Sequence, residues 1–342
     1  MPITGVYFIP SAPNAQPALA AITERLRTAF ADEDLIPLGY WKLDHKLMRD
    51  TPGLLPASAN PSQKPSKPRY MQFLSLTHYP THGFVYTSET AEKQFHPPNV
   101  ASASPTPSAP GPGATSPSGA TPGAAATPMQ PGAGAATDLP MIMATVAPAA
   151  YSTLFQHFTY ACQPFWCHRL TVSVPNGMAY DVGDFRVRVG DVRQTFPTVR
   201  VRGTVVEIEW RGPSVVDAVA ASTRESRAGK TGSGEDADSG IDVSVLAVEE
   251  GDVEAEYAAT AVLIRELWAR IGVEGAREAI LVPGVGKEIK EQMVRYRTGK
   301  EETHKQPEFV ASWSAAPQEM DPNPLAGTDL ARQYMEVLRF NR

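Results

Sequence analysis

The sequence predicts an α+β fold in which an antiparallel, β-barrel-like sheet is flanked by helices and interrupted by disordered insertions. Three observations support this prediction. Short runs rich in β-branched and aromatic residues recur along the chain, apolar and charged residues alternate over 185–210, and strands do not alternate regularly with helices. Such alternation is typical of antiparallel strands with one buried and one wetted face. We expect the sheet to close into a barrel.

The N-terminal part of the chain predicts four strands and one helix. The strands are the β-rich runs 3–9, 36–43, 69–76 and 83–88. The helix carries apolar residues every three or four positions, namely Leu19, Ile22, Leu26 and Phe30. The last two strands are expected to form a hairpin across HYPTHG, where His78 and His82 would be exposed turn residues.

The C-terminal part predicts further strands and three helices. The strands are 140–147, 184–192, 198–210 and 241–248. The helices are 149–161, 253–271 and 328–339. Gly272 lies where a C-terminal cap is expected, and Thr328 is expected to be the N-cap of the last helix. That helix would bury Leu330, Tyr334, Val337 and Leu338.

We expect residues 1–342 to form a single domain with two disordered insertions. The first, 97–138, consists mainly of Pro, Ala, Ser and Gly, and no charged residue occurs from Pro97 to Thr137. The second, 222–240, reads STRESRAGKTGSGEDADSG. Neither composition can bury enough apolar surface to offset the entropy of ordering.

Charge and cysteine content exclude several classes of protein. The net charge is −6, which gives no electrostatic basis for nonspecific nucleic-acid binding. We also expect no direct sequence-specific DNA binding. Two cysteines in 342 residues argue against a secreted disulfide scaffold. No signal sequence or apolar stretch long enough to span a bilayer is present, so we expect an intracellular protein with no membrane association.

The segment CQPFWCH at 162–168 raises the question of a zinc site. The segment contains three possible ligands, Cys162, Cys167 and His168, and His157 lies just upstream as a fourth. Zinc sites usually combine two ligand pairs from separate segments, and no second pair follows here. We therefore predict no metal and no cofactor, and we interpret the cysteines as buried, inert thiols.

Glu207 and Glu209 form the one pair that could support catalysis. Two carboxylates at alternate positions of a strand face the same side and could hold a divalent cation in a barrel lumen. Inward arginines such as Arg186 and Arg188 would complete a metal-dependent, tunnel-type triphosphate phosphohydrolase. A second strand with the same pair is missing, so we favour an exposed face with cross-strand Glu–Arg pairs. No Ser/His/Asp constellation occurs either, and we predict no catalytic residue.

Long segments of the chain resemble the subunit 20 family of the fungal Mediator complex. The opening MPITGVYFIPSAPNA with ITERL and the run RYMQFLSLTHYPTHGFVYTS are similar to that family. The clearest block is FQHFTYACQPFWCHRLTVSVPNGMAYDVGDFRVRVGDVRQTFPTVRVRGTVVEIEW. The two low-complexity insertions are the departures, at places where members of the family are expected to vary.

The resemblance implies a role, a location and partners. A family member would be a non-enzymatic structural subunit of the Mediator head module, a nuclear coactivator of RNA polymerase II transcription. It would form a heterodimer with Mediator subunit 18, whose fold is similar, and the C-terminal segment of subunit 8 would tether the pair to the other head subunits. Contact with RNA polymerase II would be indirect.

A partner interface of this kind would use aromatic anchors with a polar rim. Aromatic residues at strand ends and in loops are the candidates, namely Tyr86, Phe165, Trp166 and Tyr334. As anchors they would have to be exposed in the isolated chain. The interpretation that we favour for each of them is that it belongs to the core.

Overall fold

A computed structural model of the chain describes residues 2–11, 18–51, 69–89, 142–219, 248–298 and 325–340. The strands are β1 (Thr4–Pro10), β2 (Ile36–Asp50), β3 (Arg69–Leu76), β4 (Gly83–Glu89), β5 (Ile142–Val146), β6 (Trp166–Val182), β7 (Phe185–Phe196), β8 (Arg200–Trp210) and β9 (Arg277–Ala279). The helices are α1 (Leu19–Ala29), α2 (Pro148–Gln156), the π-helical turn η2 (His157–Ala161), α5 (Glu250–Ile271), α6 (Lys287–Thr298) and α7 (Thr328–Val337). Both predicted insertions lie outside the described residues, and so does the predicted strand 241–248 apart from Val248, which is not in a strand.

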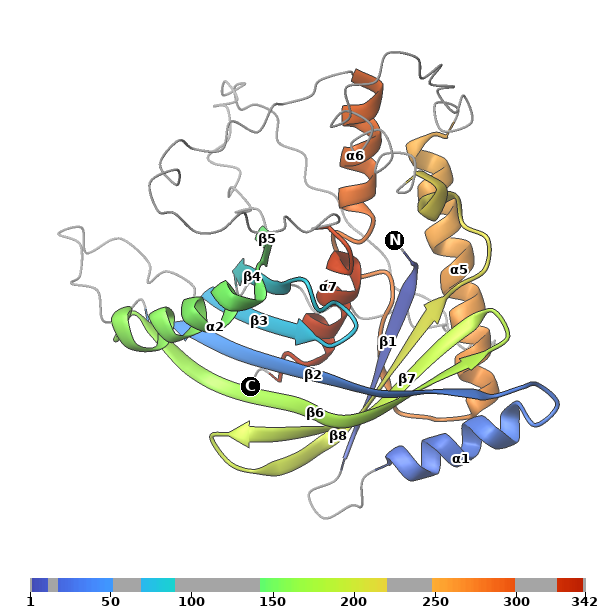
Figure 1. Cartoon of the computed structure of the whole chain (residues 1–342), viewed down its shortest axis with the longest axis horizontal. Helices are drawn as coiled ribbons and strands as arrows, with labels where there is room; N and C mark the ends of the chain where they lie inside the picture. The colour runs from blue at the N-terminus through green and yellow to red at the C-terminus, as the bar shows by residue number, and fades with distance from the viewer. Residues whose placement is uncertain are drawn as a thin grey trace, which may run out of the picture.

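The described strands form one nine-stranded sheet in the order β5-β4-β3-β2-β6-β7-β8-β1-β9. Every neighbouring pair is antiparallel, which confirms the predicted α+β class. The expected hairpin of β3 and β4 is present, with Leu74 opposite Phe84. The sheet curves strongly but stays open, because β5 and β9 at its two ends do not pair with each other (Figure 1). The expectation of full closure into a barrel was therefore wrong.

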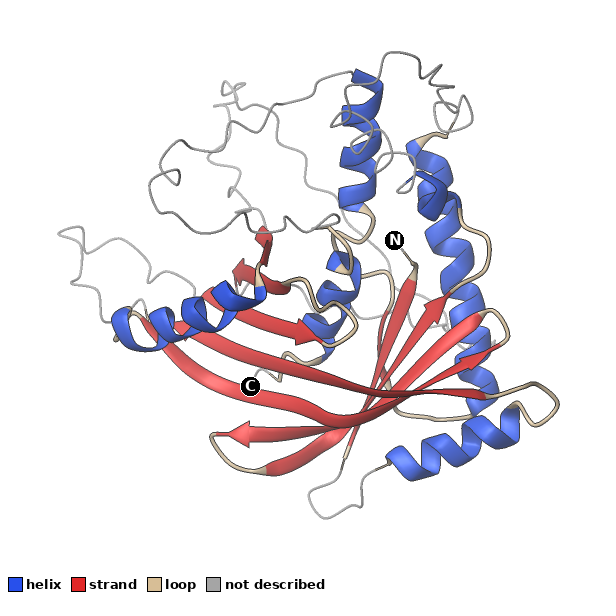
Figure 2. Cartoon of the chain, in the orientation of Figure 1, coloured by secondary structure: helices blue, strands red, loops and turns tan. Residues whose placement is uncertain are grey.

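Both faces of the curved sheet are covered. Successive residues of β1 point to opposite faces, so Val6 and Phe8 join one apolar core while Tyr7 joins another. Helices α1 and α5 lie against the outer face, and α7 lies within the concavity (Figures 1 and 2). The concave face is thus filled by the last described helix of the chain.

The outer layer follows the predicted helical pattern. Ile22 and Leu26 of α1 are buried against the sheet together with Ile264 of α5. Burial of each such side chain contributes about 1.5–3 kcal/mol. Gly272 ends α5 in the left-handed conformation, at φ 67°, as predicted. None of the described helices is long and apolar enough to span a membrane.

Three details at element boundaries differ from expectation. Thr328 is not an N-cap, because its hydroxyl donates to the Leu325 carbonyl at 3.0 Å and Gly327 precedes α7 in the left-handed conformation. No strand was predicted over β6, which runs through the turn-like sequence PNG at 175–177, where the Trp41 ring packs directly against Gly177. The strand β9 and helix α6 were not predicted, since β9 has only three residues and α6 is mostly polar.

Gly203 provides a sharp test of the packing between β8 and β1. Its φ is +156°, and a Cβ there would lie 2.1 Å from the Ile9 carbonyl oxygen. Gly203→Ala should therefore lower the free energy of unfolding by about 1–3 kcal/mol, because backbone must move. Gly251→Ala is the matched control, since a Cβ added at that position would meet nothing within 4 Å, and it should not destabilise. Urea denaturation of the two variants measures the difference, and equal stabilities would contradict this packing.

Candidate functional site in the concave face

Helix α7 fills the concave face with its apolar stripe. Leu330, Tyr334, Val337 and Leu338 are all buried there, as the sequence predicted. They pack against alternate residues of the strands, such as Val6, Leu43 and Leu74. The concavity is therefore a packed core rather than an open lumen.

A buried ion cluster lies beneath α7. Glu207 on β8 is 0% exposed and forms an ion pair with Arg188, which stands opposite it on β7. The Arg188 Nη1 also donates to the Glu209 Oε2 at 2.7 Å. The Tyr334 hydroxyl donates to the second Glu207 oxygen at 2.6 Å. One carboxylate thus joins two strands of the sheet to the helix that covers them.

The electrostatics of the cluster keep Glu207 ionised. Burial alone would raise the pKa of Glu207, but Arg188 outweighs burial and the pKa lies below its ordinary value. Burial also lowers the pKa of His78 to about 4. His78 is therefore neutral at pH 7, and its 3.6 Å approach to Glu207 is not an ion pair at that pH. The expectation that His78 and His82 are exposed was wrong. The His78 ring packs against Trp41 and Tyr79, and His82 Nε2 lies 2.9 Å from the Ala326 carbonyl oxygen in the turn before α7.

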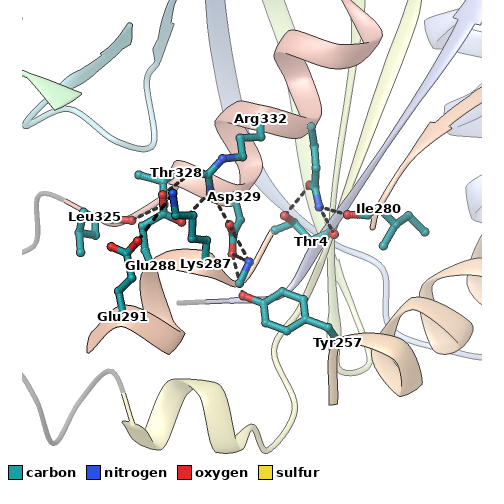
Figure 3. A network of polar contacts seen from close by, with 12 residues as sticks. Thr4, Tyr257, Ile280, Lys287, Glu288, Glu291, Leu325, Thr328, Asp329 and Arg332 are labelled. Carbon is teal, nitrogen blue, oxygen red and sulfur yellow. Dashed lines mark hydrogen bonds and ion pairs between the residues drawn. The ribbon is translucent and has the colours of Figure 1, made fainter. Parts of the chain in front are cut away.

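A second polar network holds the start of α7 (Figure 3). Asp329 accepts hydrogen bonds from the Tyr257 hydroxyl at 2.7 Å and from the Gly286 backbone N–H at 3.1 Å. Arg332 contacts Asp329 at 3.0 Å and forms an ion pair with Glu288 of α6. Burial raises the pKa of the Asp329 carboxyl despite these donors. The network fastens α7 to both α5 and α6.

Gln333 connects α7 to the sheet backbone. Its Nε2 donates to the Thr4 carbonyl at 2.7 Å and to the Ile280 carbonyl at 2.8 Å. Its Oε1 accepts from the Thr4 hydroxyl at 2.7 Å. This amide is 1% exposed and uses both donor and acceptor within the protein.

Gln333→Leu should reduce the free energy of unfolding by about 1–3 kcal/mol, because three buried polar groups lose their partner. Glu336→Gln changes an exposed side chain of the same helix and serves as the control. Thermal and urea denaturation would measure both variants. An unchanged free energy of unfolding in the Gln333→Leu variant would show that the amide does not anchor α7.

Glu207 and Glu209 both accept hydrogen bonds from Arg188, whereas the phosphohydrolase alternative requires them to hold a divalent cation. Cross-strand Glu–Arg pairing is present, but the expected exposed face was wrong, because α7 covers it and the opposite charges compensate one another. Arg186 turns instead to Asp181, at 2.8 Å. In the described part of the chain, no group of three His, Cys, Asp or Glu side chains could hold a metal ion.

The segment 162–168 forms a joint between η2 and β6. Cys162 and Cys167 are free thiols and are half-buried, not fully buried as expected, because the joint lies near the surface. His168 stacks on Phe196, with ring centroids 4.3 Å apart, and its Nε2 lies 2.8 Å from the Thr171 hydroxyl. The four possible zinc ligands therefore do not form a cluster.

The four predicted interface aromatics are distributed between core and surface. Tyr334 is 0% exposed and Tyr86 is 9% exposed, since both pack in the concave core around α7. Phe165 is 47% exposed, and Trp166 is half-buried against Phe158. Tyr334 and Tyr86 thus belong to the core, which is the interpretation that the sequence favoured, and neither is an exposed anchor. Contact of any of the four with a partner stays a prediction.

Sequence reasoning missed the residues that fasten α7. Asp329, Arg332 and Gln333 are polar positions on a helix whose apolar residues were recognised. The one available signal was a glutamine adjoining the apolar Leu330–Tyr334 stripe. A polar residue on a buried stripe must find buried partners, but the pattern does not identify them.

Comparison with known families gives a match along nearly the whole chain. Residues 1–339 match the family described as TATA-binding related factor (TRF) of subunit 20 of Mediator complex. The match spans every described element, from β1 to α7. No curated protein matches the sequence.

Among solved structures, the similarity is distant. A putative adenylate cyclase from Vibrio parahaemolyticus shares 8% identity at a TM-score of 0.24, over 68% of this chain and 88% of that one. A protein from Pyrococcus horikoshii OT3 shares 10% identity at a TM-score of 0.24, over 65% of this chain and 85% of that one. Similarity at this level carries no argument about function.

Proposed function

Because this chain belongs to the family of subunit 20 of the Mediator complex, we propose that it is a non-enzymatic structural subunit of the Mediator head module. It pairs with Mediator subunit 18, and the C-terminal segment of subunit 8 tethers the pair to the other head subunits. It acts in the nucleus, where it supports regulated RNA polymerase II transcription through indirect contact with the polymerase. It does not itself bind DNA sequence-specifically.

The observation that best supports a structural role is the filled concave face. A ligand or a metal needs an open pocket with free polar groups. Here the pocket position is occupied by α7, and the Glu207 carboxylate is bonded to Arg188 and Tyr334. These contacts favour a rigid scaffold over the tunnel-type phosphohydrolase that Glu207 and Glu209 suggested. We therefore do not retain the phosphohydrolase as a second proposal.

The surface around Phe165 is the proposed contact with subunit 18. Phe165 is 47% exposed, and Tyr160 nearby in sequence is 77% exposed. The Phe165 backbone is held in place because its carbonyl accepts from the Thr51 N–H at 2.9 Å. A large apolar side chain on a rigid backbone is typical of an interface anchor, since little entropy is lost on binding. Trp166 would support the anchor from the core side, whereas buried Tyr86 and Tyr334 would act only through their neighbours.

Phe165→Ala should weaken binding to purified subunit 18 by at least about tenfold, the loss typical of a hot spot. The free energy of unfolding should change by less than about 1 kcal/mol, because nearly half of the side chain is exposed. Isothermal titration calorimetry of the pair measures the first quantity and urea denaturation the second.

Tyr40→Ala is the matched control. Tyr40 is 77% exposed and lies near the opposite end of β2 from Asp50, which pairs with Trp166. Its removal should leave the affinity unchanged. Equal affinities of the Phe165 variant and the wild type would refute this surface, and no binding of subunit 18 by the wild type would refute the pairing itself.

A further inference from the structure

Arg202 and Arg277 lie over the ring of Phe340, which follows α7, and Arg200 lies close to Arg202. Arg200 and Arg202 lie on β8, and Arg277 lies on β9. The guanidinium carbons of Arg202 and Arg277 lie 4.8 Å and 5.6 Å from the centroid of the Phe340 ring. Positive charge is thus concentrated around one half-buried aromatic side chain, in a chain whose net charge is −6.

Within the described residues, internal contacts account for only part of the charge of Arg200 and Arg202. Arg277 donates to the Val337 carbonyl at 3.2 Å, which stabilises the C-terminal end of α7. Arg200 donates to the neutral Gln194 side chain at 3.3 Å. Among the residues that the structure describes, no carboxylate lies within ion-pair distance of Arg200 or Arg202. The Nε of Arg202 is buried and has no hydrogen-bond acceptor in that part of the chain.

Among the described residues, the surroundings of Arg202 are also electrostatically unfavourable. Burial, followed by the neighbouring charges of Arg200 and Arg277, lowers the pKa of Arg202. Like charges gathered at one place lower stability unless an anion neutralises them. A buried donor without an acceptor adds to this cost. An acidic ligand would relieve both.

We propose that Arg200, Arg202 and Arg277 form a docking site for an acidic peptide segment of a partner protein, which also packs against Phe340. Carboxylates match the planar donors of guanidinium groups, and they can accept from the Arg202 Nε. The Phe340 ring offers an apolar contact that a polyanion without apolar groups would not use. A nucleic acid fits less well, since its binding depends on many phosphate contacts along an extended basic surface. The proposal does not depend on pairing with subunit 18.

Fluorescence anisotropy with the full chain tests the site. The probe is a short labelled peptide of Asp, Glu and Phe, and the reference peptide replaces the acids with Asn and Gln. We expect the acidic peptide to bind, the amide peptide to bind at least about tenfold more weakly, and added salt to weaken the acidic complex. Arg200→Glu with Arg202→Glu should abolish binding. The single variant Arg200→Glu changes an exposed position, so it should fold and can be tested even where the double variant does not fold.

A matched charge change elsewhere provides the control. Arg27 and Lys287 have side chains that are 62% and 56% exposed, and their double change to Glu alters the net charge equally. This control should bind the acidic peptide like the wild type. Unchanged binding by Arg200→Glu, or tighter binding of a single-stranded oligonucleotide than of the peptide, would overturn the proposal. Binding only after removal of residues 341–342 would also overturn it, because the chain's own end would then be the occupant.

Discussion

Glu207→Ala is expected to lower the free energy of unfolding by about 3–5 kcal/mol, the typical cost of removing one partner from a buried ion pair. The change leaves Arg188 buried with Glu209 as its remaining counter-ion, and it leaves the Tyr334 hydroxyl without an acceptor. Because Glu207 connects β7, β8 and α7, the loss should be global. Urea denaturation followed by circular dichroism measures it.

Two further variants separate the ion pair from simple loss of packing. Glu209→Ala should lower the free energy of unfolding by only about 1–2 kcal/mol, because the Glu209 side chain is 14% exposed and Arg188 still forms its ion pair with Glu207. Glu207→Met combined with Arg188→Met should be more stable than Glu207→Ala, since the two most deeply buried charges are removed together and Glu209, whose side chain is 14% exposed, is the charge that remains. A Glu207→Ala variant as stable as the wild type would contradict the buried cluster.

Stability is expected to decrease as the pH falls from about 7 to about 4. His45 and His78 each have a pKa lowered to about 4 by burial. His78 faces Glu207 and Arg188, while His45 contacts Gln72 at 3.0 Å between Asp44 and Lys46. Between the unfolded pKa of about 6.5 and the folded pKa, only the unfolded chain binds these protons. As the pH falls through this range, each histidine therefore lowers the free energy of unfolding by about 3 kcal/mol. Above the range this loss is absent.

Histidine variants isolate this effect from that of other titrating groups. The raised pKa of Asp329 acts in the opposite direction, because the folded state then binds its proton more tightly. His45→Asn and His78→Phe should each flatten the dependence of unfolding free energy on pH between about 4 and 6.5. His157→Gln changes an exposed side chain and is the control. Unaltered slopes in both buried-site variants would show that these histidines titrate normally in the folded protein.

Much of the sheet could be predicted from local pattern. The alternation in VVEIEW placed Glu207 and Glu209 on one face of a strand, and the arginines of β7 on the matching face. Periodicity shows which residues share a face but not what covers it. The covering residue, Tyr334, is 127 positions from Glu207 in the chain, so no local pattern indicated burial.

The polar anchors of α7 were unpredictable for the same reason. Gln333 meets Thr4 across 329 positions, and Asp329 meets Tyr257 across 72. The apolar stripe identified α7 as a buried helix, but several faces of the sheet could have received it. Only the tertiary arrangement shows that α7, the last of the described helices, fills the concavity that the strands leave open. A candidate catalytic pair thereby became a structural ion cluster.

Affinity purification of the full chain from nuclear extract tests the central claim, membership of Mediator as a structural subunit, most directly. Identification of co-purifying chains by mass spectrometry should recover subunit 18, subunit 8 and other head subunits in comparable amounts. The Phe165→Ala variant should recover them at a reduced level, and the Tyr40→Ala variant should match the wild type. Recovery of no Mediator subunit, together with triphosphate hydrolysis that Glu209→Gln abolishes, would contradict the claim.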